Sequence, residues 1–224
     1  MSRLRFVIAS LLLSSAVGCA AATAGSGTPM KPVVVQPAKP AIDRAALRAK
    51  LAERRAITMS HFLAYRESRV YPLNTFGGTR HVWQDVNGNL CAAATLISYD
   101  WGRPSTENVG KENLQIALAK VTSGPLADWI LTSGLTHHEI VAIQVPGSDE
   151  MGGGRMPMIR PDPENQRLYG IYLDVERQLT GLADESLDAA TDALMKRPEL
   201  ARELLGGHVA SAGKYTAKID VATK

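Results

Sequence analysis

The stretch that most constrains the fold runs from His81 to Ile97, where the dipeptide Asn87-Gly88 separates two apolar segments. Asn-Gly between apolar runs is a strong short-range signal for a two-residue β-hairpin, because both residues tolerate the positive φ that type I′ turns require. The dipeptide therefore predicts paired strands over residues 81–86 and 89–97. Residues 89–97 would be apolar on both faces of such a strand, which places that strand in the interior.

Residues 89–97 also fit a helix, because Asn89 is a suitable N-cap and three successive alanines favour helix by propensity. The two interpretations differ in what they make of Cys91. In the strand, Cys91 is a small buried hydrophobe with a protonated, inert thiol, and this is the interpretation we favour. In the first turn of a helix its thiolate would be stabilised by the helix dipole, an arrangement that papain-like hydrolases combine with a histidine from elsewhere, here His81, His137 or His138.

Outside this stretch, helical periodicity alternates with Gly and Pro breaks. The segment Asp100–Asn108 is predicted to be a loop. The patterns predict helices over Asp43–Arg69, Glu112–Val121, Pro125–Leu131, Ile140–Gln144 (opened by a Thr136–Glu139 capping box), Leu168–Leu182, a stretch capped by Asp184, and Glu199–Leu205. We therefore predict one α+β domain that is mostly helical, with the β-hairpin at its centre.

The N-terminal segment has the anatomy of a bacterial export signal. Arg3 and Arg5 precede an apolar core, Phe6–Val17, which is too short to be read as a membrane-spanning helix. Four prolines between residues 29 and 40 then predict an extended tether. The expected organisation is a signal at 1–18, a Pro-rich tether at 19–41 and one globular domain at 42–224. From about residue 206 the tail either adds a strand (Tyr215–Val221) or has no regular structure.

The end of the signal resembles the processing site of bacterial lipoproteins, in the run Ala16-Val17-Gly18-Cys19, with Ala16 where leucine is usual. The resemblance implies that Cys19 is diacylated and becomes the mature N-terminus. Alanine directly after Cys19 is similar to lipoproteins released to the outer membrane. The alternative is cleavage at Ala22-Thr23-Ala24, which leaves a soluble secreted protein. Both predict export: to the cell envelope, outer-membrane-anchored or periplasmic, or otherwise to the medium.

The chain has two cysteines, and Cys19 is expected to be either acylated or removed. Cys91 is then left without an intramolecular disulfide partner, even in an oxidising compartment. The fold must be held by its hydrophobic core, which a domain of this length can supply.

The formal net charge of +3 falls to +1 when Arg3 and Arg5 are removed, because 23 basic residues then face 22 acidic ones. This balance argues against nucleic acid as a partner. Residues 43–69 nevertheless carry seven basic and three acidic groups. We expect this basic helix to pack on the more acidic remainder of the chain; association with an anionic membrane surface is the alternative.

No catalytic or cofactor motif stands out. His137 and His138 are adjacent, so they point about 100° apart on a helix and lack the i, i+4 spacing of a helical zinc site. Gly152–Gly154 lacks the Lys-Ser/Thr of a phosphate-binding loop. We therefore predict no metal and no cofactor. The expected function is that of a non-enzymatic envelope protein, which contacts the membrane through its N-terminal lipid and binds or scaffolds an unknown protein or small ligand. The alternative is a thiol-dependent hydrolase using Cys91.

Overall fold

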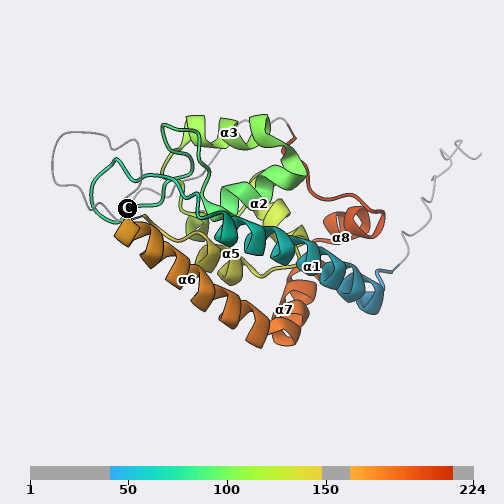
Figure 1. Ribbon diagram of the computed structural model, residues 1–224. Helices are drawn as coiled ribbons and strands as arrows, with labels where there is room; N and C mark the ends of the chain where they lie inside the picture. The colour runs from blue at the N-terminus through green and yellow to red at the C-terminus, as the bar shows by residue number, and fades with distance from the viewer. Residues whose placement is uncertain (1–40, 148–161, 214–224) are drawn as a thin grey trace, which may run out of the picture. The chain divides into compact units, whose positions relative to one another are not determined.

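The computed structural model describes residues 41–147 and 162–213, which belong to one compact unit, Pro40–Lys224. The export signal, Cys19, nearly all of the predicted tether, Gly152–Gly154 and the strand predicted at Tyr215–Val221 lie outside the described residues. In chain order the elements are α1 (Arg44–Ser68), α2 (Ala92–Trp101), α3 (Arg103–Glu112), the short 3₁₀ helix η1 (Leu118–Lys120), α4 (Gly124–Thr132), α5 (His137–Ile143), α6 (Asp162–Gly181), α7 (Ala183–Met195) and α8 (Pro198–Leu205) (Figure 1).

The predicted α+β class is wrong, because the described residues contain helices and no strand. A turn forms at Asn87-Gly88, but it is not the predicted two-residue type I′ turn. The amide of Asp85 donates to the carbonyl of Asn89 at 3.0 Å, so three residues lie between the paired ones, and Gly88 has a positive φ (83°) whereas Asn87 does not. The pairing stops after a single antiparallel bridge between Gln84 and Leu90. An isolated hairpin is marginal in water, and here the chain beyond Leu90 turns directly into α2 instead of extending the ladder.

Some of the other secondary-structure predictions are confirmed and others are wrong. The helices predicted from Asp43, Pro125, Thr136 and Leu168 onward are confirmed. The Asp100–Asn108 loop is wrong, since α3 begins at Arg103, and the helix predicted at Glu112–Val121 is reduced to η1.

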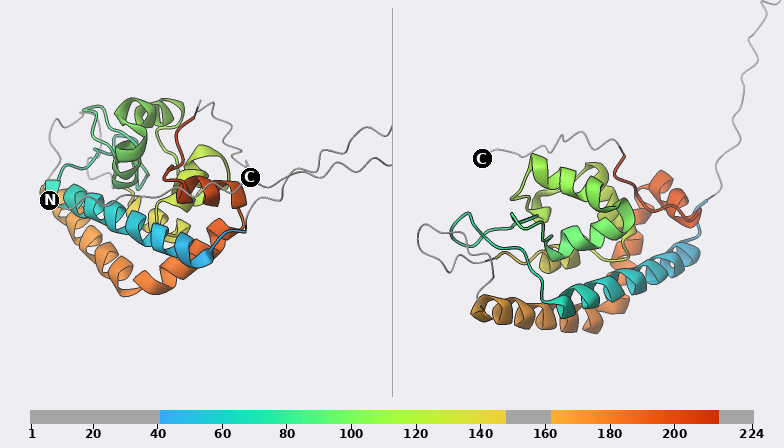
Figure 2. Two further views of the ribbon diagram at one scale, coloured as in Figure 1. Left: turned by 90° about the vertical axis from the view of Figure 1, so that its right-hand side faces the viewer. Right: turned by 45° about the horizontal axis from the view of Figure 1, so that its top comes forward.

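Helix α1 is the element on which the other helices are assembled, and it contacts α2, α6, α7 and α8. Asp43 caps its first turn by accepting from the amides of Ala45 and Ala46, at 2.8 and 3.2 Å. Figures 1 and 2 show α1 running the length of the described unit, with α6 and α7 on one side and α2, α3 and α8 on the other. None of the described helices is both long enough and apolar enough to cross a membrane.

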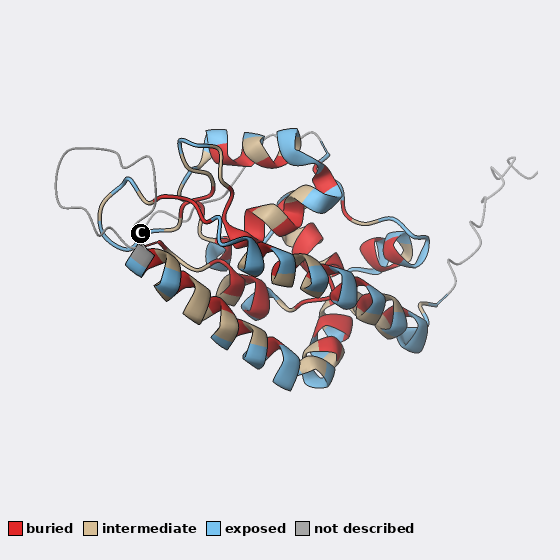
Figure 3. Cartoon of the chain, viewed as in Figure 1, coloured by how far each residue is buried: buried red, intermediate tan, exposed pale blue. Residues whose placement is uncertain are grey.

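Two apolar clusters form the core, and α1 contributes to both. Leu47 and Leu51, in its first half, pack with residues of α7 and α8. Phe62 and Tyr65, in its second half, join the larger cluster built from α2, α4, α5 and α6. Burial follows the same division: in Figure 3 the exposed residues lie on the outer faces of α1 and α6, and the buried ones face the remaining helices.

Buried polar side chains separate the two clusters at the middle of α1. The Arg54 guanidinium pairs with Asp100 at 2.6 Å, and Asp100 also accepts from the Trp129 indole at 2.7 Å. Arg55 pairs with Glu139, and both side chains are 7% exposed. We call these side chains the polar belt of α1 (Arg54, Arg55, Asp100, Trp129 and Glu139). Because buried charges need such partners, the polar belt fixes the position of α1 against α2 and α5.

The basic segment of α1 packs on acidic residues of the fold, as its charge predicted. Near its N-terminus Arg44 pairs with Asp188 and Asp192, and Arg48 pairs with Asp184 and Asp188, all of them on α7. These arginines therefore form ion pairs with carboxylates of the same unit.

Candidate functional site

Cys91 lies at the start of a helix and not in a strand, as the N-cap of α2. Its sulfur accepts from the amide of Ala94 at 3.5 Å. The helical alternative for this stretch was thus closer to the structure, although α2 begins two residues later than it implied. The side chain nevertheless lies in the interior, since Cys91 is 3% exposed and belongs to the larger apolar cluster.

Burial raises the pKa of the Cys91 thiol to about 11, and the backbone N–H groups at the start of α2 offset this only in part. The helix terminus therefore does not produce a reactive thiolate. A nucleophilic cysteine needs the opposite balance, with a lowered pKa and an accessible sulfur.

Cys91 is expected to resist alkylation in the folded protein. A pKa of about 11 against an ordinary 9.0 lowers the thiolate fraction near pH 8 about a hundredfold, and burial slows the reaction further. Labelling with iodoacetamide, followed by mass spectrometry with and without urea, should give modification of Cys91 only in urea. Rapid labelling of the native protein below neutral pH would contradict the inert assignment.

None of the three candidate histidines is hydrogen-bonded to Cys91 in the described residues. His137 Nε2 lies 2.8 Å from the carbonyl of Leu118, and His138 is exposed on α5. His81 is half-buried, and burial lowers the pKa of its imidazole while contact with the backbone of Gln144 opposes this. Within residues 41–147 and 162–213 no hydrogen bond joins Cys91 to a histidine, so the arrangement needed for a thiol hydrolase is not assembled there.

The His137-His138-Glu139 run is explained by local structure. The Thr136 hydroxyl accepts from the amide of Glu139 at 3.2 Å, and Glu139 accepts in return from the amide of Thr136 at 2.7 Å, which completes the predicted capping box. No group of three or more metal-ligating side chains is found in the described part of the chain.

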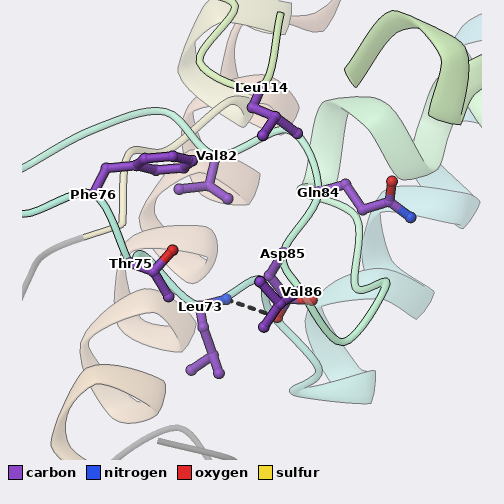
Figure 4. A pocket seen from close by; sticks show the side chains of 8 residues that line it. All are labelled: Leu73, Thr75, Phe76, Val82, Gln84, Asp85, Val86 and Leu114. Carbon is purple, nitrogen blue, oxygen red and sulfur yellow. Dashed lines mark hydrogen bonds between the residues drawn. The ribbon is translucent and has the colours of Figure 1, made fainter. Parts of the chain in front are cut away.

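The candidate site is a hollow of about 190 Å³ between the segment that joins α1 to α2 and Leu114, which follows α3. Figure 4 shows one group of side chains (Phe76, Val82, Leu114) facing another (Leu73, Thr75, Val86). Asp85 lies next to Val86 in the second group, and Gln84 lies at one side. The segments that form it are distant in sequence and are joined by the hydrogen bond from the Trp83 amide to the Leu114 carbonyl, at 2.8 Å.

Three of the large apolar residues around the hollow are exposed: Phe76 by 38%, Leu114 by 42% and Val86 by 62%. Leu73 and Val82 are buried beneath them yet belong to neither core cluster. The hollow therefore has its own apolar lining, apart from the cores. Exposed apolar side chains that gather around a concavity are typical of binding surfaces, whereas scattered ones are not.

Asn74 holds the loop that carries Phe76. Its side-chain amide donates to the carbonyls of Gly78 at 2.6 Å and Gly147 at 3.0 Å, and its side-chain oxygen accepts from the amide of Phe76 at 3.0 Å. The opposite wall is ordered by Asp85, whose carboxylate binds the amide of Leu73 at 2.9 Å (Figure 4). The hollow is thus shaped by hydrogen-bonded loops, which lowers the entropic cost of filling it.

This site was not predicted from the sequence. The Asn-Gly turn drew attention to residues 81–97, but no periodicity marks Phe76 or Leu114 as neighbours. A sequence signal that could have indicated the site is the presence of apolar residues in loops rich in Gly and Pro, where polar residues are usual.

Comparison of the chain with protein-family models, with curated proteins and with solved structures gave no match.

Proposed function

We propose that the chain is an exported, non-enzymatic binding protein of the bacterial cell envelope, anchored through Cys19, whose folded unit holds an apolar group of a partner protein in the hollow beside Val86. The observation that carries this proposal is the apolar lining of the hollow, with Phe76, Val86 and Leu114 left exposed around it. The buried position of Cys91 gives no comparable support to a hydrolase.

The size of the hollow indicates what kind of group fits. A cavity of about 150 Å³ accommodates a benzene molecule, whereas pockets for drug-sized ligands start at about 300 Å³. A hollow of about 190 Å³ matches one aromatic ring or one branched aliphatic side chain. Interfaces between proteins are commonly anchored by one such side chain in a pocket, which favours a protein partner over a free small molecule.

Photo-crosslinking in the producing cells tests the binding role. With p-benzoylphenylalanine at the position of Val86, irradiation should give a discrete adduct with another protein. The same probe at the position of Leu182, which is 53% exposed on a surface formed by other elements, serves as the matched control. Identical adduct patterns from both positions, or none from Val86, would remove the support for the hollow as a binding site.

Mass spectrometry of the mature N-terminus tests the anchor separately. The proposal expects a diacylated Cys19, and Cys19→Ser should shift the protein from the membrane to the soluble fraction. An unmodified chain that starts at Gly25 would show ordinary signal cleavage and would overturn the anchor while leaving the hollow untouched.

A further inference from the structure

We infer that the partner carries a carboxylate beside the apolar side chain that fills the hollow, and that Arg80 binds this carboxylate. The inference rests on the proposed function and specifies the chemistry of the partner: an acidic peptide segment with one large apolar residue.

Arg80 is bonded to two residues that each directly follow a residue of the lining, Gly77 after Phe76 and Gln115 after Leu114. Its guanidinium donates to the carbonyl of Gly77 at 3.1 Å and to the side-chain oxygen of Gln115 at 3.0 Å. Gln115 directly follows Leu114, which lines the hollow, and Arg80 precedes Val82 by two residues. The guanidinium is therefore held next to the apolar lining by contacts on two segments.

The charge of Arg80 is not neutralised within the described fold. Both of its side-chain hydrogen bonds go to neutral acceptors, and among residues 41–147 and 162–213 no carboxylate forms an ion pair with it. Arg80 is exposed, and its guanidinium has more N–H donors than these two bonds use. By contrast, Arg103, on the nearby α3, is paired with Glu107 at 2.7 Å.

Asp85 is the acidic group that lines the hollow, and it does not offer a matching site for a cationic partner. One of its carboxylate oxygens accepts from the amides of Asn87 and Asn89, at 2.9 and 2.8 Å. The other accepts from the amide of Leu73 at 2.9 Å and from the side chain of Asn89 at 3.0 Å. The lone pairs of this carboxylate are therefore already used by the turn and by Leu73, whereas the Arg80 guanidinium has N–H donors left over.

Three blocked peptides test the inference against the chain from Ala20 onward, which keeps the whole compact unit: acetyl-Asp-Phe-Asp-amide, acetyl-Asp-Ala-Asp-amide and acetyl-Lys-Phe-Lys-amide. Titrations followed by two-dimensional NMR should show the first peptide binding most tightly, with shifts centred on Phe76, Val86 and Leu114. The Lys-Phe-Lys peptide should bind about two- to fivefold more weakly, the range expected for one exposed ion pair.

Matched variants assign the effect to residues. Arg80→Gln should remove the preference for Asp-Phe-Asp over Lys-Phe-Lys, whereas Arg177→Gln, an exposed arginine on α6, should leave it unchanged. Val86→Asp should weaken every phenylalanine peptide about tenfold or more. Val70→Asp, with the same change at a residue 52% exposed and outside the lining, should not.

The outcomes separate the two proposals. Equal binding of Asp-Phe-Asp and Lys-Phe-Lys, with shifts at the hollow, overturns the role of Arg80 and leaves the binding function standing. No shift with any phenylalanine peptide overturns both. Sedimentation of the wild type as a dimer that Val86→Asp dissociates would show that a second copy of the chain occupies the hollow, and would overturn the acidic partner.

Discussion

Replacement of Gly134 by alanine is expected to destabilise the fold by at least about 4 kcal/mol, enough to unfold many domains of this size. Gly134 links α4 to α5 with a φ of 82°, and a Cβ there would lie 2.3 Å from the backbone nitrogen of Arg55 and 2.4 Å from the carbonyl oxygen of Leu51. Both atoms are backbone atoms of α1, so no rotamer change relieves the overlap. The linker would have to move away from α1, which would also weaken the bond from Arg55 to the Gly134 carbonyl.

Two other glycines provide graded controls for this substitution. Gly124 also has a φ of 82°, but nothing lies within 4 Å of a Cβ built there, so Gly124→Ala should cost about 1–2 kcal/mol from backbone strain alone. Gly170 lies in α6 and has equally open surroundings, so Gly170→Ala should stabilise by about 0.5–1 kcal/mol through helix propensity. Urea denaturation should show Gly134→Ala as the least stable of the three variants, Gly124→Ala as intermediate and Gly170→Ala as the most stable. A Gly134→Ala variant no less stable than Gly124→Ala would show that α1 does not approach the linker this closely.

Local chemistry explains which parts of the fold the sequence could predict. The cap at Asp43 and the Thr136–Glu139 capping box depend on residues within one turn of each other, so single-sequence reasoning finds them. The turn signal at Asn87-Gly88 is also local, and a turn forms there, although with three residues instead of the predicted two. Whether strands extend from this turn could not be predicted from local sequence, because it depends on the tertiary contacts that the chain after Leu90 makes.

The errors around α2 and α3 have tertiary causes. Cysteine is not a favoured N-cap, so the start of α2 at Cys91 carried a weak signal. Helix α3 lacks an apolar stripe because it buries small residues against a large one: a Cβ on Gly110 would lie 2.7 Å from the Trp83 ring. The Trp83 indole also donates to the carbonyl of Thr106 at 2.8 Å. Such a contact across 23 residues of chain leaves no periodic pattern to detect.

The hollow was also not predicted, because it depends on contacts between residues that are distant in the sequence. Its lining comes from residues 73–86 and from Leu114, brought together by backbone hydrogen bonds such as that from Trp83 to Leu114. Exposure is what makes Val86 and Phe76 informative, and a sequence does not give exposure. The candidate histidines His81, His137 and His138 show the opposite case: the residue types suited to catalysis are present in the sequence, but in the described residues none of them is hydrogen-bonded to the Cys91 thiol.

Glu139→Gln is expected to destabilise the fold by about 3 kcal/mol or more, because it leaves Arg55 buried without a counter-charge. The Arg55 guanidinium donates to both carboxylate oxygens of Glu139, at 2.7 and 3.0 Å, and also to the carbonyl of Leu179 at 2.6 Å. With its bond to the Gly134 carbonyl, the guanidinium makes four hydrogen bonds, so the arginine cannot turn outward without breaking them. Glutamine keeps the shape and an acceptor for the capping box, so most of the measured loss reports the ion pair. Glu53→Gln, the same change at an exposed residue paired with Lys50, should stay within about 0.5 kcal/mol of wild type.

The pH dependence of this loss distinguishes the ion pair from a packing effect. Burial by itself raises the pKa of Glu139, but hydrogen bonds from Arg55 and from the Thr136 amide outweigh it and hold the pKa below its ordinary 4.5. A carboxylate whose pKa is lower in the folded state contributes its full stability above the unfolded pKa and loses it as the pH falls through the folded value. Urea denaturation should therefore show the largest difference between wild type and Glu139→Gln near neutral pH, and a narrowing difference below about pH 4.5. A difference that stays constant down to about pH 3 would show that glutamine disturbs packing instead, and the polar belt at the middle of α1 would then owe its stability to hydrogen bonding and shape, not charge.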